Sequence, residues 1–188
     1  MAELRDGAGC LILTDAAHEA DARALEDALS VPCGRAAWRG GRGAYDAAQF
    51  AFQEQCARRS VKAVAAFGAG CLPALALAVQ LPVDRLALVD ATPSETGEDR
   101  RLSRFARRNL ALCGAEILWA GRAEDAMWRR LLCRLPGRIA CLDACDRAEN
   151  GPLPKCEFSV KNAVCGFLQA GVHSKLLAEN PEMCIIYG

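Results

Sequence analysis

The chain has 188 residues and equal numbers of basic and acidic side chains, 23 Lys and Arg against 23 Asp and Glu. A composition that is 52% hydrophobic and 24% charged excludes a disordered chain, and the length suits one domain, residues 1–188, with a sizeable buried core. Zero formal net charge and the absence of a long apolar run exclude a general attraction to nucleic acid and a bilayer span, so we expect no nucleic acid and no membrane among its partners.

The N-terminus and the cysteines indicate a reducing compartment. The first residues carry acids and lack the apolar segment of a secretory signal peptide. The 11 cysteines are odd in number, contain no Cys-x-x-Cys pair and lie mostly inside apolar runs. We therefore expect a cytoplasmic protein without a metal site, whose cysteines are small reduced core residues, Cys10, Cys113, Cys133, Cys141 and Cys165 among them.

Short apolar runs alternate with longer segments of helical periodicity along the whole chain. The glycine-rich run 39–43 and the polar runs 92–99 and 146–156 are expected loops. The tail 171–188 is irregular, with a short edge strand expected over 183–187. In chain order we expect a strand over 10–14, a helix over 20–30, a weaker strand over 31–38, a helix over 46–59, a strand over 61–67, a helix over 72–81, a strand over 85–89, a helix over 101–112, a strand over 116–120, a helix over 126–135, a strand over 138–144 and a helix over 159–170.

This alternation predicts the fold class. Strands that are apolar on both faces and separated by helices indicate a parallel sheet covered on both sides. With right-handed crossovers this gives a three-layer α/β/α sandwich of about six mostly parallel strands. Ligands of such folds bind where the carboxyl ends of the strands meet, so the loops that follow the strands are the places to search for chemistry.

One glycine turn permits a nucleotide-binding interpretation. Gly68-x-Gly70 follows a strand and opens a helix, and Asp90 ends the next strand 20 residues after Gly70. Such glycines let a pyrophosphate approach a helix N-terminus, and such an acid binds a ribose hydroxyl. Pro73 stands where the third glycine of the fingerprint belongs, and the motif lies about 60 residues into the chain rather than at its start. A nucleotide binder using the turn from Gly68 to Pro73 is therefore one alternative.

The same turn, with the segments around it, resembles the α/β-hydrolase superfamily. The run Gly68-Ala-Gly-Cys-Leu-Pro-Ala-Leu-Ala-Leu-Ala78 is similar to the strand-turn-helix that carries the nucleophile, which in the family reads Gly-x-Ser-x-Gly. The resemblance implies an α/β-hydrolase-like fold over most of the chain. Further segments that resemble the family are Trp38–Gly43 (the Arg-Gly-x-Gly loop that follows the preceding strand), Tyr45–Asp46 with the helix after it (the approach to the turn), Leu86–Asp90 (the strand after the nucleophile helix), Ile117–Gly121 with Glu124 and Asp125 (the strand and loop of the catalytic acid) and Asn162–Leu168 (the closing helix).

The comparison with the family also shows which catalytic groups are missing. Aligning Gly68 with the first glycine of the motif places Gly70 at the nucleophile, and glycine has no hydroxyl or thiol. No histidine stands near Asp146, where the general base should fall, and only an acid, Glu124 or Asp125, remains. The resemblance therefore implies a protein that is inactive by the Ser-His-Asp route and acts as a binding or structural protein.

The chain starts at what would be the third strand of the family, so we expect no cap domain and a shallow, open site. Its ligand would be an unidentified small molecule or a protein partner, with no cofactor, and the sequence leaves a homodimer open. The residues expected at the mouth of the site are Asp15, His18, Gly70, Cys71, Leu72, Asp90, Asp125 and Asp146.

Two further groups carry alternatives. Cys71 lies near a helix N-terminus, where the dipole lowers a thiol pKa. A hydrolase or thioesterase using Cys71 with His18 is therefore a second hypothesis. Otherwise Cys71 is a small residue packed under the helix.

An arginine-rich helix face can bind a phosphate or an acidic partner, or it is a solvated face paired with Glu98 and Asp99. Its arginines are Arg100, Arg101, Arg104, Arg107 and Arg108.

Overall fold

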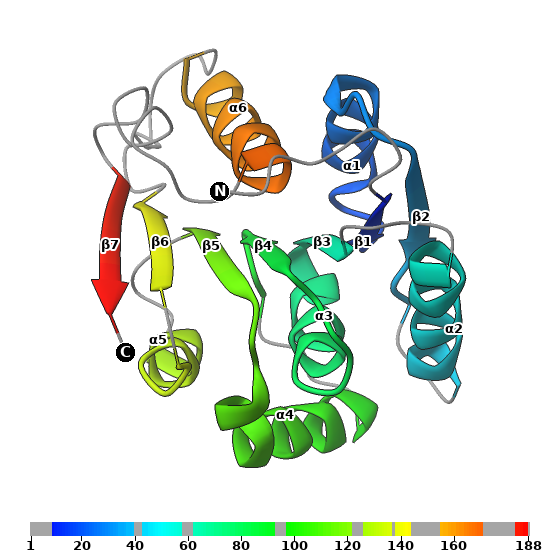
Figure 1. Cartoon of the computed structure of the whole chain (residues 1–188), viewed down its shortest axis with the longest axis vertical. Helices are drawn as coiled ribbons and strands as arrows, with labels where there is room; N and C mark the ends of the chain where they lie inside the picture. The colour runs from blue at the N-terminus through cyan, green and yellow to red at the C-terminus, as the bar shows by residue number, and fades with distance from the viewer. Residues whose placement is uncertain are drawn as a thin grey trace.

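The structure, a computed structural model, describes residues 9–39, 43–57, 62–92, 97–121, 126–136, 138–143, 155–170 and 183–187. These residues form a seven-stranded sheet in the order β2-β1-β3-β4-β5-β6-β7. The first six strands of that order are parallel, and β7 runs antiparallel to β6 at the edge (Figure 1). The strands are β1 Gly9–Thr14, β2 Cys33–Ala37, β3 Lys62–Phe67, β4 Arg85–Val89, β5 Glu116–Gly121, β6 Arg138–Asp143 and β7 Met183–Tyr187.

Helices cover both faces of this sheet, which confirms the expected three-layer α/β/α sandwich. On one face lie α1 (Glu19–Ala28) and α6 (Lys155–Ala170) (Figure 1). On the other lie α2 (Ala44–Ala57), α3 (Cys71–Ala78) and α5 (Ala126–Leu132). The side chains of each strand alternate between the two layers: Leu11 and Leu13 pack toward α2 and α3, and Cys10 and Ile12 toward α1 and α6. Burial on both faces explains why the strands read as continuous apolar runs.

The helix α4 (Gly97–Asn109) adds an outer layer on one side of the sandwich. It packs on α3 rather than on the sheet, and Figure 1 shows α3 lying between the sheet and α4. All eight residues of α3 are therefore buried, which suits its sequence of Cys, Leu, Pro and Ala alone. Leu102 and Ala106 make the inward stripe of α4. Pro73 sits in the first turn of α3, where a missing N–H costs nothing.

Several expected boundaries were wrong by a few residues. Residues 97–99 are helical rather than part of a polar loop, so α4 begins before Arg101. Residues 155–156, expected in a loop, belong to α6, whose helix-forming sequence starts before Ser159. The expected edge strand over 183–187 is confirmed.

Seven cysteines are free thiols in the structure, but they are not all core residues: Cys10, Cys33, Cys71, Cys113, Cys133, Cys141 and Cys165. Cys10, Cys71 and Cys113 are buried as expected, whereas Cys133 is exposed just after α5. In the part of the chain described here, no helix is long and apolar enough to cross a bilayer.

Candidate functional site

The strand order identifies one place in the sheet where a ligand site is expected. The chain runs from β1 outward to β2 and then back across β1 to β3, so the order reverses between β1 and β3. At such a switch point the loops after the two strands diverge, and open α/β folds bind ligands in the resulting crevice. Here these two segments are residues 15–18 and the short 3₁₀ turn Gly68–Gly70.

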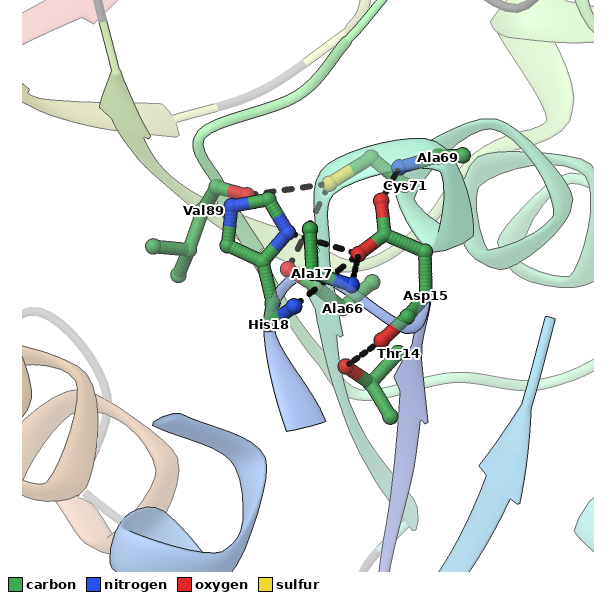
Figure 2. A network of polar contacts seen from close by, with 8 residues as sticks. All are labelled: Thr14, Asp15, Ala17, His18, Ala66, Ala69, Cys71 and Val89. Carbon is green, nitrogen blue, oxygen red and sulfur yellow. Dashed lines mark hydrogen bonds and ion pairs between the residues drawn. The ribbon is translucent and has the colours of Figure 1, made fainter. Parts of the chain in front are cut away.

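The carboxylate of Asp15 joins the two segments. Its Oδ1 accepts the N–H groups of Ala17 and His18, each at 3.1 Å, and lies 2.7 Å from Nδ1 of His18. Its Oδ2 accepts the N–H of Ala69 at 2.8 Å, 54 residues further along the chain (Figure 2). Burial would raise the pKa of Asp15, but the bonds from Ala69 and His18 outweigh it, so the pKa is held below its ordinary value. The carboxylate is thus the anion that joins both loops.

The imidazole of His18 is oriented by Asp15 and by an aromatic ring. With Nδ1 held by Asp15, Nε2 lies on the opposite side of the ring (Figure 2). The ring stacks on Phe67, the last residue of β3, with centroids 6.5 Å apart and planes at 27°. The Asp15 and His18 side chains are each 19% exposed, and both residues lie in the loop that follows β1 at the switch point.

The tip of the turn after β3 is Gly68. Its φ is +55°, the left-handed conformation that favours glycine, and a Cβ there would clash with Oδ2 of Asp15 and lie 2.6 Å from Nδ1 of His18. Gly70, which the sequence placed at the tip, is helical with φ −67°. The sequence pattern therefore placed the tip of the turn two residues too far along the chain. The signal that gives the correct register is the strand itself, since its apolar run ends at Phe67 and the next residue must turn.

Gly70 has a different structural reason to be glycine. A Cβ at this position would lie 2.9 Å from the carbonyl oxygen of Leu13, so the turn packs closely on the end of β1. Gly70, Cys71 and Leu72 are all buried rather than open at the mouth of a site. Three of the residues expected at the mouth therefore belong to the packing beneath it, because the turn begins two residues earlier than expected.

Cys71 is buried under the turn and does not face the switch point. Its side chain has no exposed surface, and its thiol donates to the carbonyl oxygens of Ala66 at 3.3 Å and Val89 at 3.4 Å (Figure 2). Burial is the main cause that raises the pKa of this thiol, and the carboxylates of Asp90 and Asp15 raise it further. The helix N-terminus therefore does not produce a thiolate here, since desolvation of the charged form dominates.

Asp90 follows β4 in a left-handed conformation with φ +46°. Its N–H donates to the carbonyl oxygen of Ala120 at 2.8 Å, and the N–H of Thr92 reaches the carbonyl oxygen of Gly68 at 3.3 Å. The residues after β4 thus border the turn at Gly68. The other expected site residues, Glu124, Asp125 and Asp146, lie outside the described residues.

Among the described residues, the switch point brings together Asp15, His18 and the turn at Gly68, and it leaves Cys71 beneath them. Sequence reasoning missed Gly68 as the tip, the N–H of Ala69 as a donor and Phe67 as the platform for His18. The chain matches no protein-family model, and the search among curated proteins finds no similar protein.

Proposed function

We propose that this chain is an α/β-hydrolase-like protein that has no ester-hydrolysing chemistry and acts as a binding or structural protein. One observation carries the proposal: the Asp15 carboxylate occupies the space next to Gly68 that a nucleophilic side chain would need. A side chain at the tip and the present position of Asp15 exclude each other. The tip has no nucleophile, and its surroundings leave no room for one.

The oxyanion donor supports the same proposal. In the α/β-hydrolase family, the N–H of the residue after the nucleophile stabilises the oxyanion of the tetrahedral intermediate. With Gly68 at the tip, that donor is the N–H of Ala69, which already donates to Asp15. A carboxylate in this position would also repel a developing oxyanion. The left-handed turn between β3 and α3 supports the likeness to the family, whereas Asp15 argues against its chemistry.

The two alternative functions are less well supported. A hydrolase or thioesterase using Cys71 needs an accessible thiolate, and this thiol is buried with a raised pKa. A nucleotide binder needs free N–H groups at the turn to hold a phosphate. There the N–H of Ala69 is bonded to Asp15, and the negative charge of that carboxylate disfavours a second anion.

The proposal is tested by measuring ester and thioester hydrolysis with the purified chain, using p-nitrophenyl esters and acyl-thioester substrates, together with labelling by a fluorophosphonate probe. We expect no turnover above the buffer rate and no labelling of the wild type, and the same result for Cys71→Ser. Turnover that is lost in Cys71→Ser or His18→Ala would establish an active hydrolase and overturn the proposal. A rise in melting temperature with NAD or ATP that is absent in Gly68→Ala would favour the nucleotide binder instead.

A further inference from the structure

The outer face of α4 carries the most concentrated charge in the described structure. Its five arginines, which we call the arginine face, are all exposed. At about 100° per residue they fall within an arc of about 120°, opposite the stripe of Leu102 and Ala106 that packs toward α3. The arginine face consists of Arg100, Arg101, Arg104, Arg107 and Arg108.

No described acid neutralises this face. The ion pairs among the described residues lie at α1, β2 and the Asp15 loop, and none includes an arginine of α4. The polar contact found for these side chains runs from Nε of Arg104 to the carbonyl oxygen of Arg100, at 3.3 Å. Like charges three and four residues apart destabilise an isolated helix. The arginine face thus has no described acid to neutralise it, and a negatively charged partner would relieve this repulsion.

Two large apolar side chains are exposed, one on α4 and one just after it. Phe105 is 37% exposed on α4, and Leu112 is 69% exposed in the short turn that follows it. Arginine and aromatic side chains together are typical of the centres of protein–protein interfaces. Nucleic-acid surfaces need a broader excess of basic charge, whereas this chain is formally neutral. These observations favour a protein partner.

The spacing of the arginines indicates the form of that partner. Arg100, Arg104 and Arg108 follow each other at four-residue steps, so they stand about 6 Å apart along the axis of α4. Carboxylates at the same four-residue steps on a second helix have the same separation. Each guanidinium can then bind a carboxylate with two hydrogen bonds.

We propose that the arginine face of α4 docks an acidic amphipathic helix of a partner protein. Carboxylates at helical spacing bind the arginines, and apolar side chains of the partner contact Phe105 and Leu112. The inference deepens the proposed function and rests on it, since it names the class of partner for a protein that acts by binding.

The test uses a synthetic fluorescein-labelled peptide of about 18 residues, about 27 Å long as a helix, with Glu at four-residue steps and Leu beside them. Binding is followed by fluorescence anisotropy. We expect saturable binding that weakens at least ~10-fold between about 50 and about 300 mM NaCl, because salt screens exposed charges. A peptide with Gln for every Glu, and a scrambled peptide of the same charge, are the matched controls and should bind at least ~10-fold more weakly.

Three variants of the chain complete the design. The double variant Arg104→Glu, Arg108→Glu should weaken binding at least ~10-fold, whereas Arg134→Glu, at an exposed arginine outside the arginine face, should change it less than ~2-fold. Phe105→Ser should weaken binding several-fold without changing its salt dependence. Circular-dichroism melts check that each variant remains folded.

The inference is overturned if the Glu peptide shows no saturable binding, if the scrambled peptide binds equally well, or if the charge reversal has no effect. It is also overturned if a single-stranded RNA oligonucleotide or a phosphatidylserine vesicle binds more tightly than the Glu peptide at the same salt concentration. Ester hydrolysis measured on the same preparation separates the two proposals. A hydrolase that binds the peptide contradicts only the proposed function, and an inert protein that does not bind it contradicts only the docking surface.

Discussion

The switch point between β1 and β3 and the outer face of α4 use charge in opposite ways. At the switch point, the carboxylate of Asp15 is bonded to backbone N–H groups of both loops and to His18. On α4, five guanidinium groups point away from the core, with no described acid to pair with them. The place where this fold class holds a ligand is thus bridged by the protein's own side chain. The charge available to a partner lies instead on the outermost helix.

The largest effect that we expect concerns the reactivity of the thiol beneath the switch point. Cys71 is fully buried, so an alkylating reagent reaches it only when the surrounding structure opens. In the folded protein at pH 8, we expect iodoacetamide to modify Cys71 at least ~1,000-fold more slowly than in denaturant. Peptide mass spectrometry after timed quenching measures the rate at each cysteine. Cys133, which is exposed, is the internal control, and equal rates at the two cysteines would mean that the site beneath the turn is open.

The second effect tests whether Asp15 and Gly68 compete for one space. Gly68→Ala places a methyl group against the Asp15 carboxylate and forces alanine into a left-handed conformation. We expect a loss of about 3 kcal/mol in the free energy of unfolding, from backbone strain and from the displaced hydrogen bonds together. Urea denaturation measures it.

Two variants sharpen this test. Gly114→Ala is the matched control, because a Cβ at Gly114 meets nothing within 4 Å, and it should leave stability within about 0.5 kcal/mol of the wild type. In an Asp15→Ala background, where His18 is no longer held by the carboxylate and can turn away, Gly68→Ala should cost only about 1 kcal/mol, the strain of the left-handed turn. If the cost were the same in both backgrounds, the carboxylate would not be what excludes a side chain at the tip.

A smaller effect tests the charge of the bridge. Asp15→Asn keeps the shape of the side chain but loses its negative charge, and we expect a loss of about 1 kcal/mol near neutral pH, because solvent screens part of the interaction. Since the folded-state pKa of Asp15 is lowered, its contribution is complete above the pKa of the unfolded state and disappears as the pH falls through the folded-state value.

The difference in the free energy of unfolding between wild type and Asp15→Asn should therefore be largest above about pH 5 and should disappear as the pH falls below about 4. Urea melts across this range measure it. Asp27→Asn, at an exposed acid in the last turn of α1, is the control and should show no comparable difference. A difference that persists unchanged to pH 3 would show that the amide, rather than the charge, causes the loss.

The sequence predicts the sandwich well, because strands buried on both faces must be apolar throughout and the helices between them must be periodic. It also predicts that Asp15 and His18 lie at the carboxyl edge, since both follow β1 directly. The bond from Ala69 to Asp15 could not be predicted in this way. It joins residues 54 positions apart, and nothing in the sequence specifies which backbone N–H of the turn the carboxylate reaches. The sequence left Cys71 open between a place in the site and a place packed under the helix, and the structure decides for the second because the thiol lies against the carbonyl groups of β3 and β4.

The smallest effect concerns the stability contributed by the arginine face. If its arginines serve a partner rather than the fold, reversing Arg104 and Arg108 to Glu should change the free energy of unfolding by less than about 0.5 kcal/mol, and any change should be stabilising because like-charge repulsion is relieved. Urea melts at low and high salt measure it, and Arg134→Glu again serves as the control. A loss of ~2 kcal/mol or more would mean that these guanidinium groups pair within the molecule. The two regions would then be alike, each holding its charges for the fold itself, and the contrast between them would be lost.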